Sequence, residues 1–242
     1  MRNLNRTRLL PLGGISFTSG LTVMRGTSLK SLFHTSLKVL FVLMATSLFP
    51  TPSCLEASPK DKARWDRKYR TDAYIFGKAP IPFLEEHLDL LPKGKALDLA
   101  MGEGRNGVYL ATQGFKVTGL DISKEGLRKA QALAAQNGVA IETHVVDLEE
   151  YQLPAEAYDV IVCTYFLQRD LFPQIVQALK FGGMAVVETY TVDHLKYRSR
   201  FPRQFLLETN ELLHVFEGLK VIRYQALDDG QAAYASIIVQ RP

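Results

Sequence analysis

Cysteine and histidine are scarce in this sequence, and neither forms a cluster. Two cysteines and five histidines are spread over 242 residues, which excludes a disulfide-stapled scaffold. We expect no metal site, because no group of these residues has the spacing of zinc ligands. Cys163 ends the apolar run Val160-Ile161-Val162-Cys163 and is expected to be a core residue.

Acidic residues are absent before Glu56, and long apolar runs are absent throughout. Residues 1–60 contain seven Lys or Arg and one acid, a net charge of +6, whereas residues 61–242 have a net charge of −2. The second part therefore gives no electrostatic reason to expect a nucleic-acid partner. The apolar stretch at residues 39–49 falls short of the about 20 residues that span a bilayer.

The remaining composition, 47% apolar residues, suits a single core. After an amphipathic segment that contains Trp65, Tyr69 and Tyr74, a helix is expected from Pro82 to before Pro92. Apolar strand patterns then alternate with helical ones, which predicts an α/β fold with a parallel sheet covered by helices. We expect strands at residues 96–99, 115–121, 141–146, 158–164 and 184–190, helices at 108–111, 127–134 and 171–180, and a terminal antiparallel hairpin of 219–226 and 232–240.

A glycine-rich turn joins the first of these strands to a helix. Gly102, Gly104 and Gly107 let the backbone approach a ligand, and the helix start offers free N–H groups. The spacing alone also fits the dinucleotide fingerprint, whose helix receives a pyrophosphate. Asp98 precedes the turn and would repel a pyrophosphate, so it favours a ligand with an ammonium group.

Two more acids follow at the ends of later strands. Asp121 ends the second strand and can accept hydrogen bonds from both hydroxyls of a ribose. Asp147 ends the third. Each acid also has an ordinary reading, because Asp121 precedes Ser123 at a helix start and Asp147 could close a turn. Together with the glycine turn, the three acids predict a site for a nucleotide-like ligand.

The turn resembles the first motif of the class I S-adenosylmethionine-dependent methyltransferases. Ala100 stands where that motif usually has its first glycine. An alanine can replace this glycine only where φ is negative, so we expect a negative φ at Ala100. Met101 stands where a cysteine is frequent. The resemblance implies a Rossmann-like three-layer sandwich with a seven-stranded, mostly parallel sheet, and S-adenosyl-L-methionine as cofactor. The cofactor-binding residues that it implies are Asp98, Ala100, Gly102, Gly104, Arg105, Asn106, Asp121, Ile122 against the adenine, Asp147, Leu148 and Thr164.

Within this class the sequence is similar to the tellurite-resistance methyltransferase family. The segments that carry the likeness are Trp65-Asp66-x-x-Tyr69, Gly104-Arg105-Asn106-Gly107-Val108-Tyr109-Leu110-Ala111 and Glu188-Thr189-Tyr190. The likeness implies in-line methyl transfer to a small soft or anionic nucleophile, such as tellurite, selenite or a thiol. A nicotinamide oxidoreductase and a non-catalytic cofactor-binding scaffold are the alternatives.

Aromatic and basic residues after the strands are candidates for the acceptor side. Tyr69, Tyr165 and Tyr190 could face the methyl group, because aromatic faces stabilise a sulfonium. Arg198, Arg200 and Arg203 suit an anionic substrate. His194 is either a general base or, as we expect, a solvent-facing loop residue.

Residues 1–60 are expected to be a leader and residues 61–242 the methyltransferase domain. The leader has the shape of a signal peptide, although the missing acids also suit a transit peptide. Because the implied cofactor is made inside cells, a retained anchor or a true start at Met24 or later is favoured over secretion. We expect a cytoplasmic monomer or homodimer, with the apolar segment as a point of membrane association.

Overall fold

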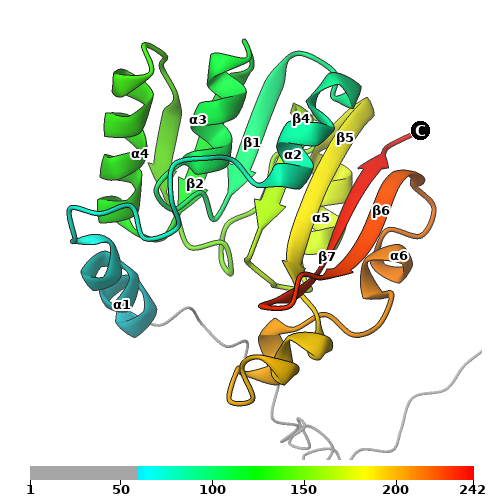
Figure 1. Ribbon diagram of the computed structural model, residues 1–242. Helices are drawn as coiled ribbons and strands as arrows, with labels where there is room; N and C mark the ends of the chain where they lie inside the picture. The colour runs from blue at the N-terminus through cyan, green and yellow to red at the C-terminus, as the bar shows by residue number, and fades with distance from the viewer. Residues whose placement is uncertain (1–58) are drawn as a thin grey trace, which may run out of the picture. The chain divides into compact units, whose positions relative to one another are not determined.

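The computed structural model describes residues 59–242, and the prediction of a leader falls almost wholly outside this part of the chain. A seven-stranded sheet with the order β3-β2-β1-β4-β5-β7-β6 forms its centre (Figure 1). The strands are β1 (Lys95–Leu99), β2 (Lys116–Asp121), β3 (Glu142–Val145), β4 (Tyr158–Thr164), β5 (Leu179–Tyr190), β6 (Lys220–Asp228) and β7 (Ala233–Gln240). Within residues 59–242, no helix is both long and apolar enough to cross a membrane.

The first five strands run parallel, and the last two form an antiparallel hairpin. Each neighbouring pair from β3 to β5 is parallel, and β7 is inserted antiparallel between β5 and β6. The predicted α/β fold class, with its terminal hairpin, is therefore confirmed. All parallel strands end at one edge of the sheet, where the loops that follow them converge (Figure 1).

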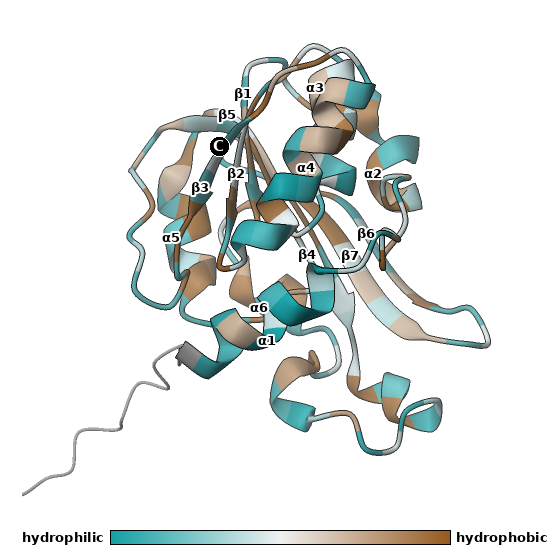
Figure 2. Cartoon of the chain, turned by 90° about the vertical axis from the view of Figure 1, so that its left-hand side faces the viewer, coloured by the Kyte–Doolittle hydropathy of each residue, from teal (hydrophilic) through white to brown (hydrophobic). Residues whose placement is uncertain are grey.

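Helices cover both faces of the sheet. The helical segments are α1 (Pro59–Tyr69), α2 (Pro82–Glu86), η1 (Leu88–Leu90), α3 (Arg105–Thr112), α4 (Lys124–Gln136), α5 (Leu171–Ala178), η2 (Val192–Lys196), η3 (Arg203–Phe205) and α6 (Glu211–Val215). Successive residues of β1 point to opposite faces: Ala96 packs in the cluster with α2, α3 and α4, and Leu97 in the cluster with α5 and α6. Polar residues lie on the outer sides of α3 and α4 (Figure 2).

Several boundaries differ from those expected. The helix expected from Pro82 to before Pro92 is divided into α2 and η1, with His87 between them in a non-helical conformation. The fifth strand begins at Leu179 and contains Gly182 in a left-handed conformation, where a helix end had been expected. The pairing of β5 with β4 shifts register at this point, from Tyr158–Leu179 to Val160–Met184, as is common where a glycine interrupts a strand.

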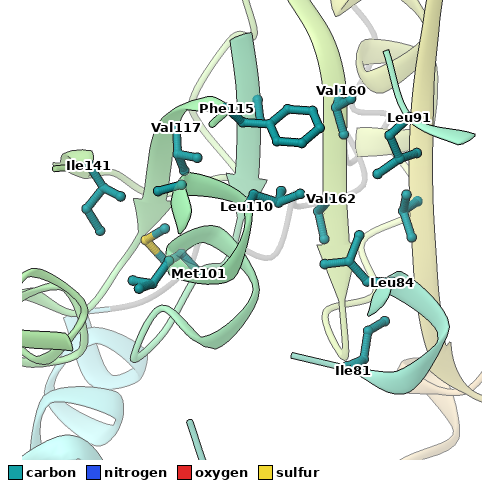
Figure 3. Close-up of a cluster of buried hydrophobic side chains, with 14 of the residues drawn as sticks. Ile81, Leu84, Leu91, Met101, Leu110, Phe115, Val117, Ile141, Val160 and Val162 are labelled. Atoms are coloured by element: carbon teal, nitrogen blue, oxygen red, sulfur yellow. The ribbon is translucent and has the colours of Figure 1, made fainter. Parts of the chain in front are cut away.

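Met101 fills a slot between two glycines in the core. A Cβ atom added at Gly119 would lie 2.0 Å from the Met101 sulfur, and one added at Gly107 would lie 2.2 Å from its methyl carbon. Figure 3 shows the Met101 side chain in the apolar cluster beside Val117 and Ile141. Methionine adapts well to an irregular gap, so this slot accommodates the larger residue where the motif often has cysteine.

We expect Gly119→Ala to lower the free energy of unfolding by about 1 to 3 kcal/mol, because the new methyl overlaps the Met101 sulfur. Met101→Ala should also destabilise the protein by leaving a cavity. Urea unfolding of the double variant should show a loss smaller than the sum of the two single losses. Strict additivity would show that the two residues do not share the slot.

Candidate active site

The glycine turn is built from residues in the left-handed region. Ala100, Gly102 and Gly104 have φ values of 52°, 57° and 88°, and Gly104 directly precedes α3. The expectation of a negative φ at Ala100 is therefore wrong. A side chain in this region costs about 1 to 2 kcal/mol, and such strain persists where the surroundings impose it, often at functional sites.

Two buried carboxylates hold this turn by accepting backbone N–H groups. Asp98 Oδ2 accepts from Gly107 N at 2.8 Å. Asp121 Oδ2 accepts from Gly102 N at 2.7 Å, and its Oδ1 accepts from Ser123 N at 2.8 Å. Ser123 itself caps α4 by accepting from Gly126 N. The strand-end acids thus fix both the turn and the helix that follows β2.

Burial disfavours the ionised form of both carboxylates. It raises the pKa of Asp98 to about 7 and that of Asp121 to about 6, against the backbone hydrogen bonds, which lower both. Within residues 59–242 no ion pair involves either carboxylate. This set of acceptors suits the ammonium and ribose hydroxyls of S-adenosylmethionine, which are hydrogen-bond donors, and disfavours a pyrophosphate.

Helix α1 packs over the same turn. Asp66 accepts from Ser123 Oγ at 2.7 Å and from Glu125 N at 3.3 Å. Tyr69 stacks on Trp65, with ring centroids 5.4 Å apart, and a Cβ at Gly102 would lie 2.7 Å from its hydroxyl. Tyr69 therefore lies against the glycine turn and does not line the pocket formed by Tyr165 and Tyr190.

Arg105 and Asn106 connect the turn to neighbouring segments. Asn106 Nδ2 donates to Thr164 Oγ1 at 2.9 Å, and its Oδ1 accepts from Ile81 N at 3.0 Å. Arg105 Nη1 donates to the carbonyl oxygen of Phe76, and its guanidinium lies 5.4 Å from the centre of the Tyr165 ring. These two side chains therefore tie the start of α3 to the end of β4.

Asp147, the third of the strand-end acids, closes a turn of the backbone. Asp147 Oδ1 accepts from Glu149 N at 3.0 Å, which closes the turn after β3. Leu148 is buried and Ile122 is half-buried. Their predicted contacts with an adenine remain predictions.

A pocket of 440 Å³ opens at the edge where the parallel strands end. Tyr165 and Tyr190 meet there, with ring centroids 4.9 Å apart. The lining comes from α2, the ends of β4 and β5, and the β6–β7 hairpin. The lining residues are Pro82, Phe83, Glu86, Tyr165, Glu188, Tyr190, Gln225, Leu227, Asp229, Ala232 and Tyr234.

Glu188 is the buried carboxylate of this pocket. Its Oε1 accepts from the Tyr165 hydroxyl at 2.8 Å, and its Oε2 accepts from Ser236 Oγ at 2.6 Å. Burial raises the pKa of Glu188, while the two hydroxyl hydrogen bonds and nearby Arg105 lower it. The sequence contained the signal for this residue in Glu188-Thr189-Tyr190 at a strand end, but the motif alone did not single out its carboxylate.

The expected solvent-facing position of His194 is wrong. Its ring is 5% exposed and stacks on Tyr190 at 4.1 Å, and its Nδ1 accepts from Ala233 N. Burial and Arg198 lower the pKa of His194. Since the ring supports Tyr190 and is absent from the pocket lining, its structural role is to position that tyrosine.

The three arginines proposed for substrate binding lie outside the Tyr165–Tyr190 pocket. Arg198 and Arg200 line a separate open groove of 450 Å³. Arg203 forms an ion pair with Glu208 at 3.0 Å. Burial raises the pKa of Tyr190, and the charges of Arg105 and Arg198 oppose this effect.

Comparisons with known proteins agree with this arrangement. Residues 96–183 match the model of a family described as a methyltransferase domain. The probable S-adenosyl-L-methionine-dependent methyltransferase TehB of Haemophilus influenzae is 28% identical over 173 residues, which cover 68% of this chain and 57% of that protein. Ubiquinone biosynthesis O-methyltransferase of Rickettsia canadensis is 30% identical over 111 residues, which cover 44% and 47%. The chain spans about half the length of the curated relatives it matches.

Solved structures show the same fold. The crystal structure of TehB from Haemophilus influenzae has a TM-score of 0.57 at 20% identity, covering 75% of this chain and 67% of that one. Geranyl diphosphate C-methyltransferase from Streptomyces coelicolor, solved with Mg²⁺, geranyl diphosphate and S-adenosyl-L-homocysteine, has a TM-score of 0.60 at 17% identity, covering 77% and 100%.

Residues 96–183 match a methyltransferase domain, and the fold and glycine turn of residues 59–242 are similar to those of the class I S-adenosylmethionine-dependent methyltransferases. Within this class the domain is similar to the TehB group, as the sequence motifs predict. The predicted cofactor, S-adenosyl-L-methionine, is confirmed as that of the family. Each of these relatives is named as a methyltransferase, which disfavours the nicotinamide alternative.

The free energy of unfolding of the protein without cofactor should fall between pH 5 and pH 8. Asp98 has a pKa of about 7 when folded against an ordinary value of 3.8, so the folded state binds more protons than the unfolded state in this range. The stability due to protonated Asp98 is complete below pH 3.8 and is lost as the pH rises through about 7, with a slope of about 1.4 kcal/mol per pH unit at most.

Urea unfolding of Asp98→Asn at both pH values isolates this contribution, because all other titrating groups are common to the two chains. The variant should show a shallower fall than the natural chain. An identical slope in both would contradict the raised pKa of Asp98.

Proposed function

We propose that this chain is a methyltransferase that moves the methyl group of S-adenosylmethionine in line to a small-molecule acceptor in the Tyr165–Tyr190 pocket. One observation carries the proposal: the glycine turn, which Asp98 and Asp121 hold, and the Tyr165–Tyr190 pocket lie at the same edge of the sheet. Arg105 reaches the Tyr165 ring, and Asn106 bonds to Thr164 at the end of β4. Cofactor and acceptor sites side by side are what methyl transfer requires.

The chain's residues need only align and shield the reaction. The cofactor supplies an already activated methyl group, so most of the rate gain can come from orientation and exclusion of water. Asp98 and Asp121 offer acceptors for the ammonium and ribose groups. The faces of Tyr165 and Tyr190 favour a positive charge near the pocket. Tyr69, which covers the glycine turn, helps to keep water out.

The acceptor proposed from the sequence is a soft or anionic nucleophile, such as tellurite, selenite or a thiol. The likeness to TehB supports it. The structural neighbour that holds geranyl diphosphate supports a small molecule as acceptor in general. The cofactor-binding residues and the methyl-facing tyrosines are part of this proposal.

Calorimetric titration of the full chain with S-adenosylmethionine, S-adenosylhomocysteine and NAD tests the cofactor site. We expect the first two to bind with micromolar Kd and NAD not to bind. Transfer of a tritiated methyl group to an added acceptor then separates an enzyme from a non-catalytic scaffold. Binding of NAD alone, or no binding of any of the three, would contradict the proposal.

Asp121→Ala should weaken binding of S-adenosylhomocysteine by about 1 to 3 kcal/mol, because ribose hydroxyls would lose their acceptor. Asp89→Ala, which changes an exposed acid in η1, is the matched control and should leave the affinity unchanged. Circular dichroism of both variants checks that the fold is retained. Equal affinity in both variants would remove Asp121 from the cofactor site.

A further inference from the structure

The strand pairing of the sheet determines the position of Glu188 in the pocket. It lies in β5 between two neighbours, opposite Thr164 of β4 and opposite Ser236 of β7. Ser236 is fully buried and its hydroxyl donates to Glu188 Oε2 at 2.6 Å. A directly opposed pair in an antiparallel ladder has little freedom, so the carboxylate is held in one orientation.

Tyr165 fixes the other oxygen of Glu188 at some conformational cost. Its backbone N–H donates to the Glu188 carbonyl at 2.7 Å, and its hydroxyl donates to Oε1 at 2.8 Å. Tyr165 has a φ of 55°, which is rare for a residue with a bulky side chain. The two hydrogen bonds account for this conformation, and they bring the aromatic ring beside Tyr190 in the pocket.

Each oxygen of an ionised carboxylate has lone pairs for more than one donor. The two hydroxyls of Ser236 and Tyr165 therefore leave acceptor capacity toward the pocket that Glu188 lines. No Lys, Arg or His side chain lines this pocket, and no ion pair within residues 59–242 involves Glu188. A donor on the acceptor molecule is thus the natural partner of the remaining lone pairs.

We infer that Glu188 is the general base of the reaction, and that the acceptor carries a hydrogen on its nucleophilic atom. This inference rests on the proposed function and selects thiols over oxyanions such as tellurite within the proposed acceptor class. The hydrogen of the S–H group passes to a Glu188 oxygen, and a sulfur lone pair forms the new bond to the methyl carbon. The electron pair of the broken carbon–sulfur bond stays on the departing sulfur of the cofactor.

The charge state of Glu188 depends on burial and on three neighbouring side chains. Burial opposes ionisation and raises its pKa, whereas the Ser236 and Tyr165 hydroxyls and Arg105 favour ionisation. A carboxyl group with a raised pKa is a stronger base than an ordinary one. The titratable and charged groups around the pocket are Arg105 of α3, Tyr165 after β4, Tyr190 of β5, Tyr234 of β7, Glu86 of α2 and Asp229 of the hairpin turn.

Glu188→Gln tests the inference in the full chain, with Glu156→Gln as control. Glu156 pairs with Arg241 on the surface, away from the pocket. Tritiated methyl transfer is measured to 2-mercaptoethanol, cysteine, selenite and tellurite. We expect methylation of the thiols, a loss of about 100-fold or more in kcat for Glu188→Gln, and no loss for Glu156→Gln. Binding of S-adenosylhomocysteine should stay within twofold in both variants.

Two pH-dependent readouts separate a base from a structural residue. The kcat/KM for the thiol should fall at low pH with one ionisation, and Ser236→Ala should move this limb to higher pH because the carboxylate loses a donor. Infrared difference spectra against pH, recorded without any acceptor, should contain a carboxyl band that Glu188→Gln removes and Glu156→Gln retains.

Several results would overturn the inference and leave the cofactor assignment intact. They are methylation of selenite or tellurite alone, full activity of Glu188→Gln, a carboxyl band that survives this substitution, and no methylation of any thiol by a chain that binds S-adenosylmethionine. Failure to bind S-adenosylmethionine would instead contradict the proposed function itself.

Discussion

Backbone N–H groups bound by two buried carboxylates are the constraint on which the site depends. Asp98 and Asp121 each stand at or near a strand end and reach across to the glycine turn, at Gly107 and Gly102. Without these acceptors, the turn would present buried donors without partners, which costs about 1 to 3 kcal/mol each. The left-handed conformations of the turn, including that of Ala100, are sustained by this arrangement.

The rest of the site is fastened to the same turn. Through Asn106, the start of α3 is bonded to the end of β4 and to the segment before α2. Through Ser123, the start of α4 is bonded to α1. A further buried ion pair, Glu103 with Lys129 at 2.5 Å, joins the turn to the middle of α4. The proposed cofactor and acceptor sides are therefore parts of one hydrogen-bonded network.

The sequence predicts the features that depend on local pattern. Alternating strand and helix signals, the glycine spacing and the strand-end acids sufficed for the fold class, the family and the cofactor. Features that depend on partners far along the chain were missed. His194 accepts a hydrogen bond from the backbone of Ala233, 39 residues further along the chain. Glu188 acquires its two hydroxyl donors only when β4, β5 and β7 come together. The local sequence pattern does not predict these contacts.

Ala100 shows a different limit of local reasoning. Its side chain argues against a positive φ, yet its φ is 52°, in a turn that the hydrogen bond from Gly102 N to Asp121 holds. Arg198, Arg200 and Arg203 show another, since a run of cations in sequence spreads over a groove and a surface ion pair in space. Position in the chain therefore does not specify which charges of a basic run reach a ligand.

The β6–β7 hairpin contributes to one of the two proposed sites of the domain, and this separation bears on its evolution. The proposed cofactor side is made by residues that precede β5. Apart from Thr164, they lie within β1 to β3 and the segments that follow these strands. The proposed acceptor pocket is lined by five residues of the hairpin, Gln225, Leu227, Asp229, Ala232 and Tyr234. Insertions or substitutions in this hairpin can change the acceptor pocket and leave the cofactor site unchanged. Descendants of one ancestral domain can therefore come to use different acceptors while they keep the same methyl donor.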